Sequence, residues 1–258
     1  MSQARLRFLR FGLLILASTL LTTCGGNGPP KINSVLSQTQ TSAHYVYHYT
    51  PGDNVSPEYQ EAFYSWISGQ LSVDLEQQIQ YYKFTDVTQK QQLTGQGGNG
   101  DADPSTDSIY TIWPDDNHET THLLTATIGT PTPFFNEGIA VANQTDPLDK
   151  IYTPNWNGYS PHHWAQAYLK AGTLPALSGL LEMNAFSAFD PNMSYPIAGS
   201  FMRYLIDTYG MNTVLKLFAG ASYSDSPSTT MARFEQVIGN SFTDTEQDWH
   251  LFLQQYKD

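Results

Sequence analysis

The pattern of apolar and polar residues changes character near Pro114. Before it, aromatic and β-branched residues alternate with polar ones in three short segments, which predicts strands at residues 44–49, 78–84 and 108–113. Residues 58–70 instead repeat apolar side chains at helical spacing, which predicts a helix with one buried face. A Gly-rich stretch, residues 94–103, lacks the spacing of a phosphate-binding loop and is interpreted as a plain surface loop.

After Pro114 helical periodicity dominates, and several segments open with Pro, Asp, Asn or Thr and close near Gly. Helices are predicted at residues 116–128, 133–143, 161–171, 196–209, 212–219, 229–238 and 244–256. Strands followed by helices indicate an α+β fold. We expect a small mixed N-terminal sheet with a helix (44–113) followed by a mainly helical lobe (114–258), together forming one domain over residues 44–258.

Residues 1–23 have the pattern of a signal peptide. Arg5, Arg7 and Arg10 precede an apolar run, residues 11–21, which is shorter than the roughly 20 residues that a permanent membrane span needs. The run ends in Leu21-Thr22-Thr23-Cys24, which resembles the lipobox of bacterial lipoproteins. That resemblance implies lipidation of Cys24 and a location in the bacterial cell envelope, anchored to a membrane. The alternative is an ordinary secretory signal and a secreted protein.

Residues 24–43 are rich in Gly, Ser, Thr and Gln and are expected to form a flexible tether. The chain has a single cysteine, which excludes an intramolecular disulfide. It carries 24 acidic against 12 basic side chains, a net charge of -12. This balance argues against a nucleic-acid partner and against a polybasic membrane-surface binder. The oligomeric state is not indicated.

Candidate chemistry begins with His118-Glu119-Thr120-Thr121-His122. On a helix, residues four apart lie on one face, so both imidazoles can reach one ion, and zinc suits them. Glu119 does not need to ligate, and can take a proton from a water that the metal activates. The alternative is a helix with two solvent-facing histidines, so a second feature is needed.

That feature is the segment 133–140, which contains Glu137. A catalytic zinc takes a third protein ligand and keeps one position open. After His122 the helix is expected to run on for about two turns, roughly 10 Å, and to stop near Gly129. Residues 130–132 can reverse the chain, and a helix from Pro133 then carries Glu137 back toward the histidines. We therefore expect one Zn²⁺ per chain. Thr125 and Ile128 stand where the metzincin extension needs Gly and His, which excludes that class.

The combination of HExxH with Asn136-Glu137-Gly138 resembles the gluzincin metallopeptidases, and its short gap is similar to the compact bacterial peptidase MA-like domains. The resemblance covers about residues 44–220 and includes a Pro-Gly turn, a Gly-containing loop, a strand before HExxH and a later helix ending in Tyr209-Gly210. It implies a zincin-like fold with the metal in a cleft between the two lobes. By the same resemblance His118, His122 and Glu137 are zinc ligands and Glu119 is the general base of a peptide hydrolase.

The remaining assignments concern groups around that centre. Tyr195 is the candidate that stabilises the oxyanion, with His162 and His163 as rivals. Asn136 is either a partner that orients a ligand or the cap of its helix. Residues 109–113 are expected to be an edge strand beside the cleft, able to pair with an extended peptide.

Two other functions remain open. The first is a surface lipoprotein that binds zinc without turnover, although the intact Glu119 favours a hydrolase. The second, weaker one is a glycan binder lined by the aromatic residues Trp156, Tyr159, Trp164 and Tyr168, although core packing explains such residues more often.

Overall fold

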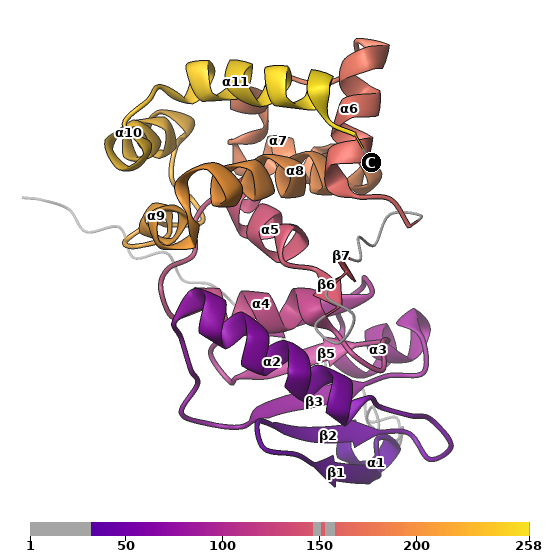
Figure 1. Ribbon diagram of the computed structural model, residues 1–258. Coiled ribbons are helices and arrows are strands. Elements are labelled where there is room, and N and C mark those ends of the chain that lie inside the picture. Colours follow the sequence, from indigo (N-terminus) through magenta and orange to yellow (C-terminus); the bar gives the residue numbers. More distant parts are fainter. Residues whose placement is uncertain (1–31, 147–150, 153–157, 258) are drawn as a thin grey trace, which may run out of the picture.

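A computed structural model describes residues 32–146, 151–152 and 158–257. The α+β class is confirmed: one mixed sheet forms the N-terminal part, and helices form nearly all of the remainder (Figure 1). Within the described residues, no helix is both long and apolar enough to cross a membrane. The predicted signal peptide and Cys24 lie outside the described residues.

The sheet has five strands in the order β1-β2-β3-β5-β4. The three predicted strand segments form β2 (Tyr45–Tyr49), β3 (Ile79–Lys83) and β5 (Ser108–Thr111), and these strands run parallel to one another. β1 (Gln38–Thr41) and β4 (Gly100–Asp103) pair antiparallel at the two edges. A separate ribbon pairs β6 (Thr145–Asp146) with β7 (Ile151–Tyr152).

One face of the sheet forms the core of the N-terminal part. Because alternate residues of a strand point to opposite faces, Tyr45, Tyr47 and Tyr81 all lie on this face and are fully buried. They belong to the same apolar cluster as residues of α2 (Pro57–Leu71) and α4 (Asn117–Ala126). The sheet thereby fixes the position of α4, the helix that carries the HExxH motif.

The prediction of a flexible tether through residue 43 is wrong for its C-terminal part. Residues 32–43 form α1 (Ile32–Val35) and β1, and Leu36 between them is only 1% exposed. β1 has the sequence QTQT and is exposed at every position, so its strand depends on backbone pairing with β2 rather than on apolar burial. Such a strand leaves no alternating apolar signal in the sequence.

The interpretation of residues 94–103 as a plain loop is also wrong. α3 (Val87–Thr94) ends where this stretch begins. The last four residues of the stretch, Gly100–Asp103, form β4. As a result β4, and not the segment 109–113, is the edge strand of the sheet. The sequence GDAD has almost no apolar content, which is why the strand is not visible from periodicity.

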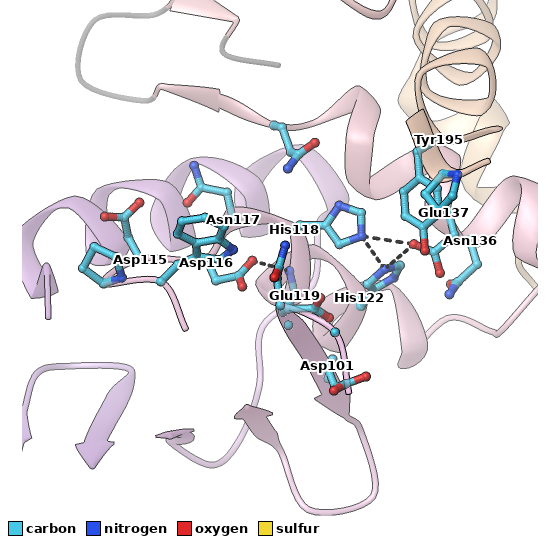
Figure 2. Close-up of a pocket in the computed structure, with 18 of the residues that line it drawn as sticks. Asp101, Asp115, Asp116, Asn117, His118, Glu119, His122, Asn136, Glu137 and Tyr195 are labelled. Atoms are coloured by element: carbon cyan, nitrogen blue, oxygen red, sulfur yellow. Dashed lines mark hydrogen bonds and ion pairs between the residues drawn. The ribbon is translucent and has the colours of Figure 1, made fainter. Parts of the chain in front are cut away.

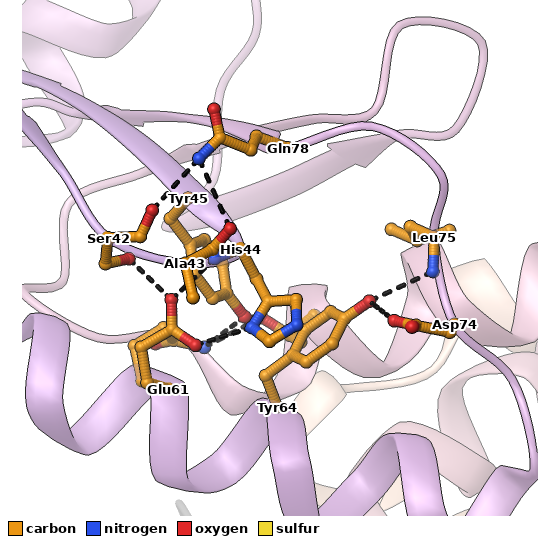
Figure 3. Close-up of polar contacts among 11 residues, drawn as sticks. Ser42, Ala43, His44, Tyr45, Glu61, Tyr64, Asp74, Leu75 and Gln78 are labelled. Atoms are coloured by element: carbon orange, nitrogen blue, oxygen red, sulfur yellow. Dashed lines mark hydrogen bonds and ion pairs between the residues drawn. The ribbon is translucent and has the colours of Figure 1, made fainter.

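A polar network joins the start of the sheet to α2 (Figure 3). Glu61 accepts hydrogen bonds from the Ser42 hydroxyl at 2.6 Å, from the His44 backbone N–H at 2.7 Å and from His44 Nδ1 at 2.6 Å. The His44 ring stacks on Tyr64 with centroids 4.0 Å apart. This network holds the β1–β2 turn against the helix.

The C-terminal part is mainly helical, as expected. Its elements are α5 (Pro133–Ala142), α6 (Pro161–Ala171), η1 (Leu177–Leu180), α7 (Met183–Ala188), α8 (Pro191–Tyr209), α9 (Met211–Val214), η2 (Leu215–Leu217), α10 (Pro227–Ile238) and α11 (Phe242–Gln255). The largest changes to the predicted helices are that the segment 212–219 is divided between α9 and η2, and that α8 begins at Pro191 rather than at residue 196.

The longer α8 contains Pro196 in its interior, where a proline leaves the carbonyl of the residue four positions earlier without its helical donor. That carbonyl belongs to Asn192, and it accepts a hydrogen bond from the Tyr168 hydroxyl of α6 at 2.9 Å. This bond satisfies the freed carbonyl, and α8 continues through Pro196, so that Tyr195 lies on the helix rather than in a preceding loop.

α5 and α8 pack closely because each contributes a glycine to the contact. A Cβ on Gly138 would lie 2.5 Å from Met202 Cγ and 2.9 Å from the Ala198 carbonyl oxygen, and a Cβ on Gly199 would lie 2.2 Å from Val141 Cγ1. This contact fixes α5, and with it Glu137, relative to Tyr195.

Candidate metal centre

α4 begins next to the sheet, at a cap that also belongs to the site. The Asp116 carboxylate accepts the backbone N–H of Glu119 at 3.1 Å and the Thr111 hydroxyl of β5 at 2.7 Å. This is the N-cap interaction that the sequence favours, and it ties the helix start to the end of a strand. His118 and His122 are four residues apart on α4 and therefore lie on the same face of the helix, with ring centroids 4.7 Å apart.

Glu137 reaches both histidines from α5. Its Oε2 lies 3.1 Å from Nε2 of His118 and 3.3 Å from Nε2 of His122, and the two Nε2 atoms are 3.0 Å apart (Figure 2). The three residues that the sequence placed together therefore converge on one point. Within the described part of the chain, this is the one group of His, Cys, Asp or Glu side chains close enough to hold a metal ion.

The donor set fits a zinc ion. Ligand atoms at about 2.0–2.1 Å from a tetrahedral zinc lie roughly 3.3–3.4 Å from one another, close to the separations here. Hydrogen bonding alone explains the arrangement less well. Each Nε2 carries at most one proton and the carboxylate is an acceptor, so at most two of the three contacts can be hydrogen bonds. A cation satisfies all three atoms at once.

Electrostatics at the centre favour a positive charge between these atoms. Burial opposes the charged form of His118, but the hydrogen bond to Glu137 and the negative charges of Glu119, Glu137 and Asp116 outweigh it and raise the His118 pKa to about 9. Burial likewise acts to raise the Glu137 pKa, but His122 and His118 lower it well below its ordinary value. Without a metal, a proton takes the place of the cation, so metal uptake must compete with protonation.

Glu119 lies in the same cavity and is 9% exposed. Burial and the neighbouring charge of Asp116 raise its pKa to about 7, and the nearby histidines only partly offset this. Its carboxylate touches the edge strand: a Cβ on Gly100 would lie 2.7 Å from Glu119 Oε1 and 2.9 Å from Asp116 Oδ2. Only a glycine allows β4 to pass this close to the two carboxylates.

The cavity has a volume of about 1110 Å³. Its lining includes all the predicted ligand and catalytic residues: His118, Glu119, His122, Glu137 and Tyr195. Residues of β4 and residues 113–117, which lead from β5 into α4, also line it. Tyr195 is brought into the site as predicted: its ring lies 6.1 Å from that of His118 in a stacked orientation. Burial raises the Tyr195 pKa, and the charge of Glu137 adds to this effect, so the hydroxyl keeps its proton.

Neither of the rival histidines lies in this cavity. His162 is buried in the helical core, where its Nδ1 is 2.8 Å from the Ser200 hydroxyl oxygen, which also accepts a hydrogen bond from Trp249 at 3.1 Å. His163 stacks on Tyr159 with centroids 4.2 Å apart. Both belong to α6, which contributes no residue to the cavity lining, so the structure favours Tyr195 over them.

The structure also shows where the residues of two other sequence assignments lie. Asn136 lines the cavity but does not cap its helix, because Thr132 is the N-cap of α5. Of the aromatic residues proposed for a glycan site, Trp156 lies outside the described residues. Tyr159, Trp164 and Tyr168 are on or beside α6, where Trp164 contacts both tyrosine rings.

Sequence reasoning missed the part of the site contributed by β4. Gly100, Asp101 and Ala102 line the cavity, as do Trp113 and Asp115. The glycine cluster at residues 95–100 was the available signal, because a glycine in a strand marks a close approach of another group.

A scan against protein-family models gives no match, and no curated protein matches the chain. The geometry of the site therefore carries the functional argument by itself.

Proposed function

We propose that this protein is a zinc-dependent metallopeptidase of the gluzincin type, with a zincin-like fold and one Zn²⁺ per chain. The observation that carries the proposal is the convergence of His118, His122 and Glu137, at separations of 3.0–3.3 Å, in a cavity that Glu119 also lines. Glu119 favours catalysis over zinc binding without turnover, because a purely structural site has no use for a carboxylate beside its ligands.

Each residue has a role in the proposed reaction. When bound, zinc would supply a water of lowered pKa and would polarise the substrate carbonyl. Glu119 accepts the proton of the attacking water and later donates it to the leaving amine. The Tyr195 hydroxyl, which keeps its proton, donates a hydrogen bond to the oxygen on which negative charge develops. Asp116 holds the backbone of Glu119 in place through the helix cap.

The edge strand supports a peptide substrate. Ile112 donates to the Asn99 carbonyl at 3.0 Å, so these two residues form a hydrogen-bonded antiparallel pair. Such pairs alternate along a ladder, which leaves the N–H and C=O groups of Gly100 and Ala102 directed away from β5, toward the free edge. Because both residues line the cavity, an extended peptide can add to β4 beside Glu119.

The proposed setting is the bacterial cell envelope. There the signal sequence and a lipid on Cys24 would attach the protein to a membrane, and the substrates would be peptides or proteins outside the cytoplasm. Lipidation is tested separately, by labelling with radioactive palmitate: the wild type should take up label and Cys24→Ser should not. An unlabelled wild type would support plain secretion.

The decisive test of the activity is Glu119→Gln. The variant should retain about one zinc per chain by metal analysis, and it should lose at least about 10³-fold in cleavage of a mixed peptide library, because it lacks the general base. Glu235→Gln, a change of the same kind at an exposed position of α10, is the matched control and should cleave like the wild type.

Equal activity in Glu119→Gln would refute the mechanism. A wild type that holds stoichiometric zinc but cleaves nothing would support the alternative, a zinc-containing binding lipoprotein without turnover.

A further inference from the structure

The ammonium group of Lys90 is completely buried beside the edge strand of the cleft. It donates a hydrogen bond to the Gly97 carbonyl at 2.9 Å and forms an ion pair with Asp101. Both acceptors belong to the segment that leads from the Gly-rich loop into β4. A buried ammonium must have its charge and its protons matched by the protein, so α3 and this segment are bound to each other.

The ion pair and Glu119 hold β4 from opposite sides. Consecutive residues of a strand point to opposite faces, and Gly100 is the residue whose Cβ position meets the Glu119 carboxylate. Asp101, the next residue, directs its carboxylate to Lys90. The two residues that fix the depth of the edge strand in the cleft are therefore neighbours, one against α4 and one against α3.

Stability alone does not account for a buried charge at this position. Replacing a buried ion pair with apolar side chains of similar volume is often neutral or stabilising, whereas an ion pair does restrict its partners to one geometry. The Asp101 side chain stays 40% exposed in the cavity wall, so the pair joins the helix to a strand that solvent also reaches.

We propose that Lys90 is a positioning residue: through Asp101 and Gly97 it fixes β4 where Gly100 and Ala102 can pair with a peptide substrate. This inference rests on the proposed peptidase function. Lys90 itself is too deeply buried to contact a substrate, and its effect is confined to substrates long enough to pair with β4.

The test compares a long and a short substrate in Lys90→Met. The long peptide extends over β4, and the short one is a blocked dipeptide with the same scissile bond. For the long peptide we expect KM to rise about tenfold while kcat stays within about threefold, because ground-state pairing is lost and the chemistry is retained. The short substrate should react as in the wild type. Lys216→Met, at an exposed lysine of η2, is the matched control and should change neither.

Hydrogen exchange of the zinc-loaded protein gives a readout that does not depend on activity. Lys90→Met should accelerate exchange of the amides in residues 97–103 by about tenfold or more, and leave the α4 amides unchanged, because only the edge strand is released. Asp101→Asn keeps the side-chain shape and removes the charge. It should show the same pattern with a smaller amplitude, and it provides the test if Lys90→Met does not fold.

The outcomes separate the two proposals. A wild type that cleaves neither substrate refutes the peptidase proposal. Hydrogen exchange at residues 97–103 then tests by itself whether Lys90 positions β4. Equal changes for long and short substrates, exchange accelerated throughout the protein, or no change in either measurement would each overturn the positioning role of Lys90.

Discussion

In the part of the chain that the structure describes, glutamate meets histidine at the β1–β2 turn and in the cleft, and the two arrangements differ in how well their polar atoms are matched. At the β1–β2 turn, Glu61 receives three hydrogen bonds, from the Ser42 hydroxyl and from the backbone and ring of His44 (Figure 3). In the cleft, Glu137 and two imidazoles direct three ligand atoms at one another (Figure 2). The hydrogen bonds of the first arrangement are complete, whereas in the second at most two of the three contacts can be hydrogen bonds, which is why we propose a cation there.

The difference shows that composition alone does not identify a candidate metal site. Both arrangements contain a carboxylate within 2.6–3.3 Å of an imidazole nitrogen. The two arrangements differ in the number of hydrogen-bond donors: Glu61 has three, whereas the three contacts of the cleft share at most two protons. The cleft also contains the side chain of Glu119. The turn uses its pair to hold the backbone, whereas the three ligand atoms of the cleft could bind one ion in place of a proton.

The largest expected effect comes from removing a ligand. His118→Ala leaves two ligand atoms, so we expect zinc affinity to fall by at least about 100-fold, and peptide cleavage with it. His44→Ala removes the corresponding imidazole of the turn and should leave zinc affinity unchanged. Competition with a chromogenic chelator measures both variants. If His44→Ala weakened zinc as much as His118→Ala, the distinction between the two arrangements would be lost.

A smaller effect is expected from Gly100→Ala. The new methyl group would lie 2.7 Å from Glu119 Oε1, so the carboxylate or the strand must move. We expect kcat to fall about tenfold to 100-fold, because small displacements of a catalytic group are costly, while zinc content is unchanged. Gly179→Ala, at an exposed position of η1 remote from the cleft, has no atom within 4 Å of the new methyl group and is the matched control. Steady-state kinetics with metal analysis distinguishes a displaced base from a lost metal.

Two helix glycines extend the comparison to stability. Gly138→Ala in α5 places a methyl group 2.5 Å from Met202 Cγ and should lower the free energy of unfolding by about 1–3 kcal/mol. Gly69→Ala in α2 meets nothing within 4 Å and should raise it by about 0.5–1 kcal/mol, because alanine suits a helix interior better. Urea unfolding measures both. The same sign for both changes would contradict the close packing of α5 on α8.

The smallest effect concerns the turn. Burial alone would raise the Glu61 pKa, but the hydrogen bonds from His44 and Ser42 lower it below 4.5. A carboxylate whose pKa is lower in the folded state than in the unfolded state stabilises the fold at pH values above its unfolded-state pKa. That contribution is lost as the pH falls through the folded-state pKa. Glu61→Gln should therefore cost about 1 kcal/mol near neutral pH, and the difference from wild type should shrink in acid. An unfolding series over pH that shows a constant difference would contradict this reading.

The parts of the fold that periodicity predicted are those with buried faces. The Tyr-rich strands β2 and β3 and the helix α2 each bury one face, and their patterns are visible in the sequence. The edge strands β1 and β4 are polar and depend on backbone pairing with their neighbours, so no local pattern reveals them. Because β4 was not predicted, the edge position was wrongly assigned to residues 109–113.

The candidate site divides in a similar way. Ligand spacing and a short reversal brought Glu137 to the histidines, because these depend on local helix geometry. The buried position of His162 and the burial of Lys90 beneath β4 depend on contacts between distant segments. A sequence pattern cannot distinguish a core histidine from one in a cleft.

The most direct test of the central claim is a crystal structure of the zinc-loaded protein with anomalous diffraction data collected at the zinc edge. We predict one anomalous peak per chain, at about 2.0–2.2 Å from Nε2 of His118, Nε2 of His122 and Oε2 of Glu137. Data from such crystals with no peak at these atoms, or with the peak at other residues, would contradict the account.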